Sequence, residues 1–215
     1  MSQRLHHERV AIGSHALPGE LVLPDAAGGL VVFAHGSGSS RLSPRNVFVA
    51  GRLHAHRLAT LLLDLLTESE AAQRANVFDI ELLSARVGEA LDWIAARSDL
   101  ADVRIGLFGA STGAAAALVA AAVRGQAVAA VVSRGGRPDL AAEHLPRVAA
   151  PTLLIVGGDD SAVLQLNREA LAALRCEKRL EIVPHATHLF EEPGALEQVA
   201  ALAAQWFALH LLPAS

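Results

Sequence analysis

Short apolar runs alternate with longer amphipathic segments along nearly the whole chain. Continuous apolar runs of about four to eight residues are typical of strands buried on both faces, and apolar residues at every third or fourth position are typical of helices. Strands that alternate with helices favour right-handed βαβ units, which build a parallel sheet covered on both faces. The pattern therefore predicts an α/β fold with a mostly parallel central sheet.

The predicted elements cover most of the 215 residues. Residues 5–14 and 19–24 are predicted to form an antiparallel pair of strands, and the polar residues 65–76 a loop. No repeat or linker interrupts the pattern, so one domain is predicted over residues 1–215. The other predicted strands are 30–34, 60–64, 103–108, 127–132, 152–156 and 179–183, and the predicted helices are 46–58, 78–97, 113–124, 163–174 and 195–210.

Composition excludes several classes of protein. The chain is 52% apolar and 19% charged with a net charge of −4, and no basic run indicates a nucleic acid or an anionic membrane as a partner. The single cysteine, Cys176, excludes an internal disulfide and a cysteine metal cluster. Residues 1–9 lack the apolar core of a signal peptide, and the apolar stretch 112–123 is too short to cross a bilayer. We therefore expect a cytoplasmic protein that needs no metal.

A Gly-x-Ser-x-Gly pentapeptide, residues 109–113, stands between the strand predicted at 103–108 and the helix predicted at 113–124. Strand, tight turn and helix in that order form a nucleophile elbow, which lifts the hydroxyl of the central residue, here Ser111, clear of the sheet. The alternative is that Ser111 only caps the helix. The context favours the elbow, and the other loops must then supply a base, an acid and an oxyanion hole.

Glycines and serines fill the loop 35–41 that follows the strand at 30–34. Small residues let backbone N–H groups approach a ligand, as an oxyanion hole requires. We expect the two donors to be the N–H groups of Ser37 and Thr112, the second at the start of a helix. A flexible turn or a phosphate-binding loop is the alternative, although the loop lacks the Lys-Ser/Thr ending of a P-loop.

Two adjacent aspartates, Asp159 and Asp160, follow the strand at 152–156. A carboxylate there could orient a catalytic histidine, and either one could instead cap the next helix. The base is expected after the strand at 179–183, where His188 is favoured and His185 is its competitor. The order serine, aspartate, histidine along the chain is that of α/β-hydrolases.

Only about 19 residues, 133–151, connect the strand at 127–132 with the one at 152–156. This connection is too short for a helical cap, so we expect an open active site. Arg134 and Arg137 in the connection, together with Arg41 near the oxyanion loop, could attract an anionic substrate. The alternative is that these arginines are solvated or structural groups.

From about Leu30 to Leu209 the chain resembles the α/β-hydrolase superfamily, and in particular its dienelactone-hydrolase-like branch. The resemblance implies an α/β-hydrolase fold without a cap and hydrolysis of esters or related acyl compounds without a cofactor. It also supports Asp160 as the acid. Dienelactone hydrolases proper have a cysteine where this chain has Ser111. The resemblance is carried by His35-Gly36-Ser37-Gly38-Ser39-Ser40-Arg41, Leu63-Asp64-Leu65-Leu66-Thr67, residues 109–113, Gly157-Gly158-x-Asp160-x-x-Val163 and His188-Leu189-Phe190-Glu191-Glu192-Pro193.

These expectations combine into a serine hydrolase of small carboxylic esters with Ser111 as nucleophile, His188 as base and Asp160 as acid. Thioester hydrolysis, acyl transfer and lactone hydrolysis on the same residues are alternatives, because a fold alone does not fix the reaction. A binding protein that keeps the fold without catalysis is another. The sequence leaves the oligomeric state open, with a homodimer among the alternatives.

Overall fold

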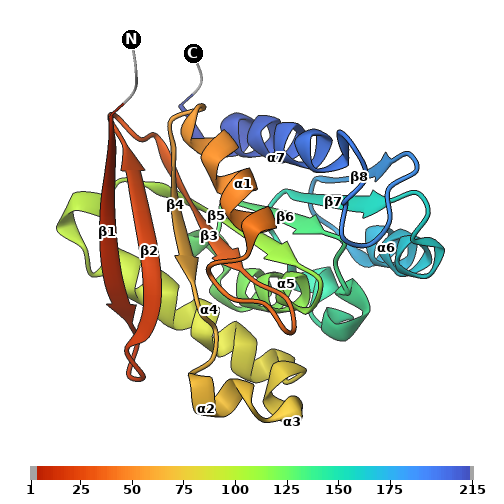
Figure 1. The fold of residues 1–215 in the computed structure, drawn as a ribbon, viewed down its shortest axis with the longest axis horizontal. Coiled ribbons are helices and arrows are strands. Elements are labelled where there is room, and N and C mark those ends of the chain that lie inside the picture. The colour runs from red at the N-terminus through yellow and green to blue at the C-terminus, as the bar shows by residue number, and fades with distance from the viewer. Residues whose placement is uncertain (1–3, 214–215) are drawn as a thin grey trace.

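The computed structural model describes residues 4–213, so the ends of the predicted 1–215 domain and the first residues of the N-terminal segment lie outside the described part. The described residues form one eight-stranded sheet in the order β1-β2-β4-β3-β5-β6-β7-β8 (Figure 1). β1 pairs antiparallel with β2 and β2 with β4, and all other pairs are parallel. The predicted mostly parallel α/β sheet is confirmed. The strands are β1 Leu5–Ile12, β2 Leu17–Pro24, β3 Gly29–Ala34, β4 Leu58–Leu63, β5 Arg104–Ala110, β6 Ala130–Arg134, β7 Thr152–Gly157 and β8 Lys178–Val183.

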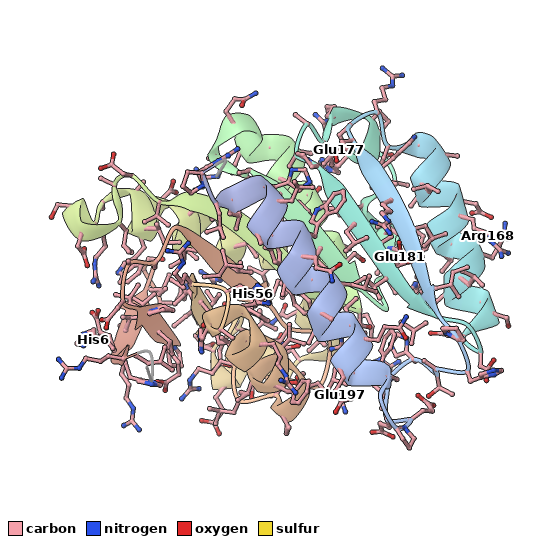
Figure 2. The ribbon with its side chains drawn as sticks, turned by 90° about the horizontal axis from the view of Figure 1, so that it is seen from above. His6, His56, Arg168, Glu177, Glu181 and Glu197 are labelled. Carbon is pink, nitrogen blue, oxygen red and sulfur yellow. The ribbon has the colours of Figure 1, made fainter. Side chains whose placement is uncertain are left out.

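Helices cover both faces of the sheet. α1 and α7 pack on one face, and α4, α5 and α6 pack on the other (Figure 1). Seen from above, α7 lies across the sheet, with Glu197 near one end of the helix (Figure 2). The helices are α1 Pro44–His54, α2 Glu68–Ala71, α3 Arg74–Val77, α4 Ile80–Ala95, α5 Thr112–Arg124, α6 Ser161–Ala173 and α7 Ala195–Leu211.

Three sequence predictions about element position are wrong. Residues 65–76 are not all loop, because they contain α2 and begin α3, and Thr67 and Glu70 form a capping box at the start of α2. β6 lies later than the predicted strand at 127–132, because a 3-10 turn occupies Gly125–Ala127. α1 spans Pro44–His54 instead of the predicted 46–58. It begins two residues earlier because Ser43 caps it and proline is well suited to the first helical position, and it ends before β4 begins at Leu58.

Two apolar layers hold the strands that carry the site. Every residue of β3, β4 and β7 is buried, as expected of central strands in a parallel sheet. Phe33 and Phe108 pack across the neighbouring strands β3 and β5, with ring centroids 4.8 Å apart. α5 is lined with alanines and is buried on nearly all sides. The packing of α5 in the core therefore fixes the start of this helix and the position of Ser111, the residue before it.

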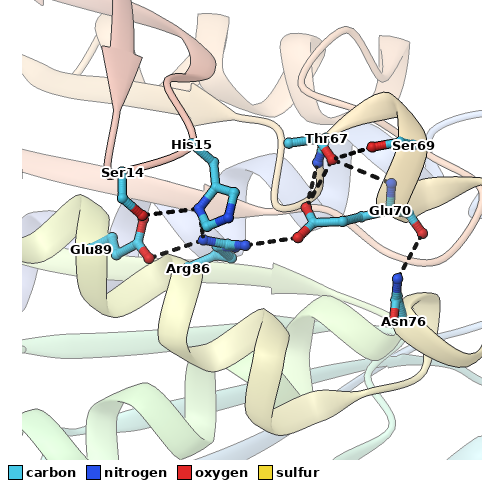
Figure 3. A network of polar contacts seen from close by, with 8 residues as sticks. All are labelled: Ser14, His15, Thr67, Ser69, Glu70, Asn76, Arg86 and Glu89. Atoms are coloured by element: carbon cyan, nitrogen blue, oxygen red, sulfur yellow. Dashed lines mark hydrogen bonds and ion pairs between the residues drawn. The ribbon is translucent and has the colours of Figure 1, made fainter.

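A polar network ties the β1–β2 turn to α2 and α4 (Figure 3). The guanidinium of Arg86 in α4, which is only 4% exposed, donates to carboxylate oxygens of Glu70 at 2.9 Å and Glu89 at 3.0 Å. The same guanidinium also contacts Nδ1 of His15 in the turn. Burying this cation is tolerable because two carboxylates surround it. The network fixes α2 beside the ends of β2 and β4.

His54, at the end of α1, makes stability depend on pH. Its ring Nε2 lies 2.8 Å from the hydroxyl oxygen of buried Thr60, and burial lowers the pKa of His54 from 6.5 to about 4. The unfolded chain therefore takes up this proton near pH 6.5 and the folded chain only near pH 4. We expect the free energy of unfolding to fall as the pH drops through that window, and to fall less in His54→Gln.

Urea denaturation at several pH values between 7 and 4.5 measures this dependence. His56→Gln is the matched control, because His56 is exposed and lies two residues further along the chain. The control should keep the pH dependence of the wild type. A His54→Gln protein with the same pH dependence as the wild type would contradict the assignment.

Candidate active site

The residues singled out from the sequence meet at the carboxyl ends of β3, β5, β7 and β8, where loops of a parallel sheet form binding sites. Ser111 and His188 line the same cavity, which has a volume of about 210 Å³. A larger cavity of about 420 Å³ adjoins it across the oxyanion loop, and Leu66, Val77 and Leu83 contribute to its wall. The smaller cavity is lined by Gly36, Ser37, Ser39, Ser43, Arg45, Asn46, Ala110, Ser111, Arg134, His188 and Leu189.

Ser111 has a strained backbone. Its φ is 52° and its ψ is −121°, a conformation that side-chain-bearing residues rarely adopt. Its N–H donates to the carbonyl of Arg134 at 3.2 Å, and its own carbonyl accepts from the N–H groups of Ala114 and Arg137, both at 3.1 Å. These bonds maintain the strain, which is of order 1–3 kcal/mol. Ser111 makes no side-chain capping bond to α5, in contrast to the alternative interpretation.

The two glycines of the pentapeptide are needed for close packing. A Cβ on Gly109 would lie 2.4 Å from Cα of Ala114, and one on Gly113 would lie 2.2 Å from the carbonyl oxygen of Ala34. Both contacts are with backbone atoms, which cannot move aside without shifting α5 or β3. The turn is therefore restricted to glycine at these two positions.

His188 and Asp160 form a direct pair. Nδ1 of His188 lies 2.8 Å from Oδ2 of Asp160, whose side chain is 15% exposed. Asp160 occupies the N-cap position of α6, yet its side chain makes no capping bond to that helix. Asp159 and His185, the competitors from the sequence, are both exposed, and neither lines the cavity at Ser111. Of the two candidate acids and the two candidate bases, the structure therefore brings Asp160 and His188 into contact.

The loops after β7 and β8 are fastened to each other by backbone contacts. The N–H of Asp159 donates to the carbonyl of Ala186 at 3.0 Å, and that of Gly158 donates to the carbonyl of Val183 at 2.8 Å. A Cβ on Gly157 would lie 2.3 Å from the carbonyl oxygen of Ala186, so the loops touch. This contact explains why Asp160 and His188 meet although 28 residues separate them.

The predicted oxyanion loop lies directly on the elbow. The N–H of Ser37 donates to Oγ1 of Thr112 at 2.9 Å, which joins the two predicted donor residues. A Cβ on Gly36 would lie 2.9 Å from the carbonyl oxygen of Ala110 and 3.0 Å from Cβ of Ser111, so this backbone passes as close as glycine permits. Nothing in the sequence pattern indicates that the Thr112 hydroxyl holds this loop.

His35 and Arg41 fix the two ends of that loop. Nε2 of His35 accepts from the N–H of Leu65 at 3.1 Å, Nδ1 lies 3.0 Å from the carbonyl oxygen of Gly36, and burial lowers the pKa of His35. The neutral ring with its proton on Nδ1 satisfies both bonds. The guanidinium of Arg41 lies 2.6 Å from Oδ2 of Asp64.

The three arginines that the sequence indicates as groups for an anionic substrate have different environments. Arg41 pairs with Asp64 and Glu20 and does not line the cavity at Ser111. Arg134 lines that cavity and is only 6% exposed. Arg137, at the far end of the same turn, pairs with Asp139.

Sequence reasoning missed three residues of the cavity, Ser43, Arg45 and Asn46, which start α1. The Ser43-Pro44 pair, a capping residue followed by proline, is the signal that could have placed this helix start correctly. Among residues 4–213, no group of three or more histidine, cysteine, aspartate or glutamate side chains is arranged to hold a metal ion. Within the same range, no helix is long and apolar enough to cross a bilayer.

A family model and a solved structure both relate this chain to dienelactone hydrolases. Residues 66–210 match the model of the dienelactone hydrolase family. The crystal structure of a dienelactone hydrolase from Anabaena variabilis is similar to this chain, with 53% identity and a TM-score of 0.93 over 98% of this chain and 100% of the other. Est1E from Butyrivibrio proteoclasticus shares the fold, with a TM-score of 0.78 at 14% identity over 95% and 98% of the two chains.

A curated relative from Mycobacterium tuberculosis is 57% identical over 203 residues, which are 94% of this chain and 46% of the relative. Its provisional name is phosphoribosyl transferase. The chain thus spans about half the length of this curated relative.

Proposed function

We propose that this chain, which belongs to the dienelactone hydrolase family and has the α/β-hydrolase fold, is a hydrolase that cleaves small carboxylic esters through an acyl-enzyme formed on Ser111. The observation that carries the proposal is the Asp160–His188 pair, 2.8 Å long, whose histidine lines the same cavity as the strained Ser111. A nucleophile, a base and an orienting carboxylate in one site are the parts that acyl transfer requires.

Asp160 determines which nitrogen of His188 does the chemistry. With Nδ1 facing the carboxylate, Nδ1 carries the proton and Nε2 is free to accept one. Oγ of Ser111 attacks the acyl carbon while its proton moves to Nε2 of His188. The tetrahedral intermediate then expels the alcohol, which takes that proton. Asp160 stabilises the transient imidazolium ion.

The second half of the reaction uses the same residues. A water molecule attacks the acyl carbon and gives one proton to Nε2 of His188, and the proton returns to Oγ of Ser111 as the carboxylic acid leaves. The N–H groups of Ser37 and Thr112 are the proposed oxyanion donors. Since the Ser37 N–H already donates to Oγ1 of Thr112, an oxyanion would share or replace that bond.

The connection between β6 and β7 supports a small, openly bound substrate. Within it the structure places only two 3-10 turns, Pro138–Ala141 and Leu145–Arg147, and no helical cap. The cavity of about 210 Å³ at Ser111 suits a short acyl or alcohol group.

Assays of the purified protein on short esters, lactones and thioesters test the proposal. We expect hydrolysis of 4-nitrophenyl acetate with an initial burst, together with labelling of one serine by a fluorophosphonate probe. Peptide mapping should place the label on Ser111. A thioester turned over much faster than its matched ester would favour the thioesterase alternative, and a protein that neither labels nor turns over any substrate would contradict the proposal.

A further inference from the structure

We propose that Arg134, Arg45 and the first turn of α1 form a binding site for a doubly charged oxyanion, so that the ester cleaved at Ser111 carries a phosphate monoester group. The inference rests on the proposed function, because it names the substrate class of that same cavity. Arg45 and Arg134 both line the cavity with Ser111.

Arg134 is a buried cation without a carboxylate partner among the described residues. Its Nη2 donates to Oδ1 of Asn46 at 3.4 Å, its guanidinium lies 5.8 Å from the ring centroid of Phe190, and its Nε has no hydrogen-bond partner. Burial, and then the charge of Arg45, lower the pKa of Arg134 to about 10. The group is therefore still charged at neutral pH. A buried charge without a counter-ion is costly, which is the mark of a site built for an anion.

Arg45 adds a second cation to the same wall. Its guanidinium lies 3.5 Å from Glu191, whose side chain is 67% exposed, and its Nε also has no partner. A surface pair of this length contributes little. The two guanidiniums thus repel each other, and an anion between them would neutralise both.

The start of α1 contributes positive potential from a third direction. Ser43, Arg45 and Asn46 belong to the cap and first turn of this 11-residue helix, and all three line the cavity. The first turn contains no acidic residue. Pro44 has no N–H and the N–H of Asn46 donates to Oγ of Ser43, so the contribution of this helix start is mainly its positive potential, which favours anions such as phosphate.

Charge and geometry favour phosphate over carboxylate. A carboxylate has one charge and two oxygens, which Arg134 alone could satisfy. A phosphate monoester carries close to two charges at pH 7 and three terminal oxygens, so it matches two guanidiniums and a helix start together. The phosphate would be held as a non-reacting handle, and the scissile acyl carbon would be placed at Ser111.

The test compares three competitive inhibitors of 4-nitrophenyl acetate hydrolysis at constant ionic strength: phenyl phosphate, benzoate and benzyl alcohol. These have similar rings and differ in charge. We expect the inhibition constant of phenyl phosphate to be at least roughly tenfold below that of benzoate, with benzyl alcohol weakest. In Arg45→Gln the constant for phenyl phosphate should rise by roughly tenfold or more, the usual effect of losing a charged hydrogen bond.

Arg52→Gln is the matched control, since it removes the same charge from the exposed last turn of the same helix. Its inhibition constants should equal those of the wild type. Equal constants for phenyl phosphate and benzoate, or an unchanged constant in Arg45→Gln, would overturn the phosphate site.

Calorimetric titration of Ser111→Ala with phenyl phosphate separates this inference from the proposed function. Binding that Arg45→Gln weakens in the same background supports the anion site even if no ester is turned over. An active wild-type enzyme whose Ser111→Ala form does not bind phenyl phosphate would overturn the inference while leaving the proposed function intact.

Discussion

Replacing Ser111 with alanine is expected to lower kcat for a neutral aryl ester by roughly 10⁴-fold or more, because no other group can form the acyl-enzyme. Labelling by a fluorophosphonate should disappear in the same variant. Initial rates and active-site titration measure both effects. Ser84→Ala, on α4 and away from the cavity, is the control and should keep wild-type rates.

Ser111→Gly distinguishes a catalytic serine from a structural one. Glycine tolerates the positive φ of 52° that strains serine and alanine. We therefore expect the glycine variant to be as inactive as the alanine variant but more stable, by roughly 1 kcal/mol in urea denaturation. Activity in either variant near that of the wild type would remove Ser111 from the mechanism.

Replacing Asp160 with asparagine is expected to lower kcat by roughly 10³- to 10⁴-fold. The amide keeps the shape of the side chain, but it can donate to Nδ1 of His188 and thereby favour the tautomer with the proton on Nε2. His188 could then no longer accept the proton of Ser111. Steady-state kinetics on the same aryl ester measure the loss.

Asp159→Asn is the matched control, because it makes the same change one residue earlier on an exposed side chain. Its kcat should stay within a few-fold of the wild type. A severe loss in Asp159→Asn with a mild one in Asp160→Asn would reverse the assignment of the acid.

Periodicity was sufficient to predict the sheet and the long helices. The spacing of apolar residues within a buried strand such as β3, or within an amphipathic helix such as α4, is enough to identify that element without knowledge of its neighbours. The short helices α2 and α3 could not be predicted in this way. α2 is stabilised by the Thr67 cap and by the ion pair from Glu70 to Arg86, which lies 16 residues away, and Asn76 in α3 donates to the carbonyl oxygen of Glu70. Contacts over such a separation leave no periodic signal.

The same limit applies to the site. Chain order indicated Ser111, Asp160 and His188 because each follows a strand that the sequence reveals. The surroundings of Arg134 were not predictable, because its neighbours Asn46 and Phe190 come from distant segments that only the fold brings together. Arg41 likewise could not be separated from Arg134 by sequence, since its ion pair with Asp64 depends on how the loop after β3 returns to β4.

Asp160 occupies the N-cap position of α6, where a carboxylate normally accepts from backbone N–H groups of the helix. Its carboxylate instead contacts His188. A capping side chain typically contributes about 1 kcal/mol. Selection for thermal tolerance alone would therefore drive residue 160 towards side chains that bond back to α6 and release the histidine. Libraries screened only for heat resistance should accumulate stable variants at this position that have lost the proposed activity, so an activity screen has to accompany any stability screen of this protein.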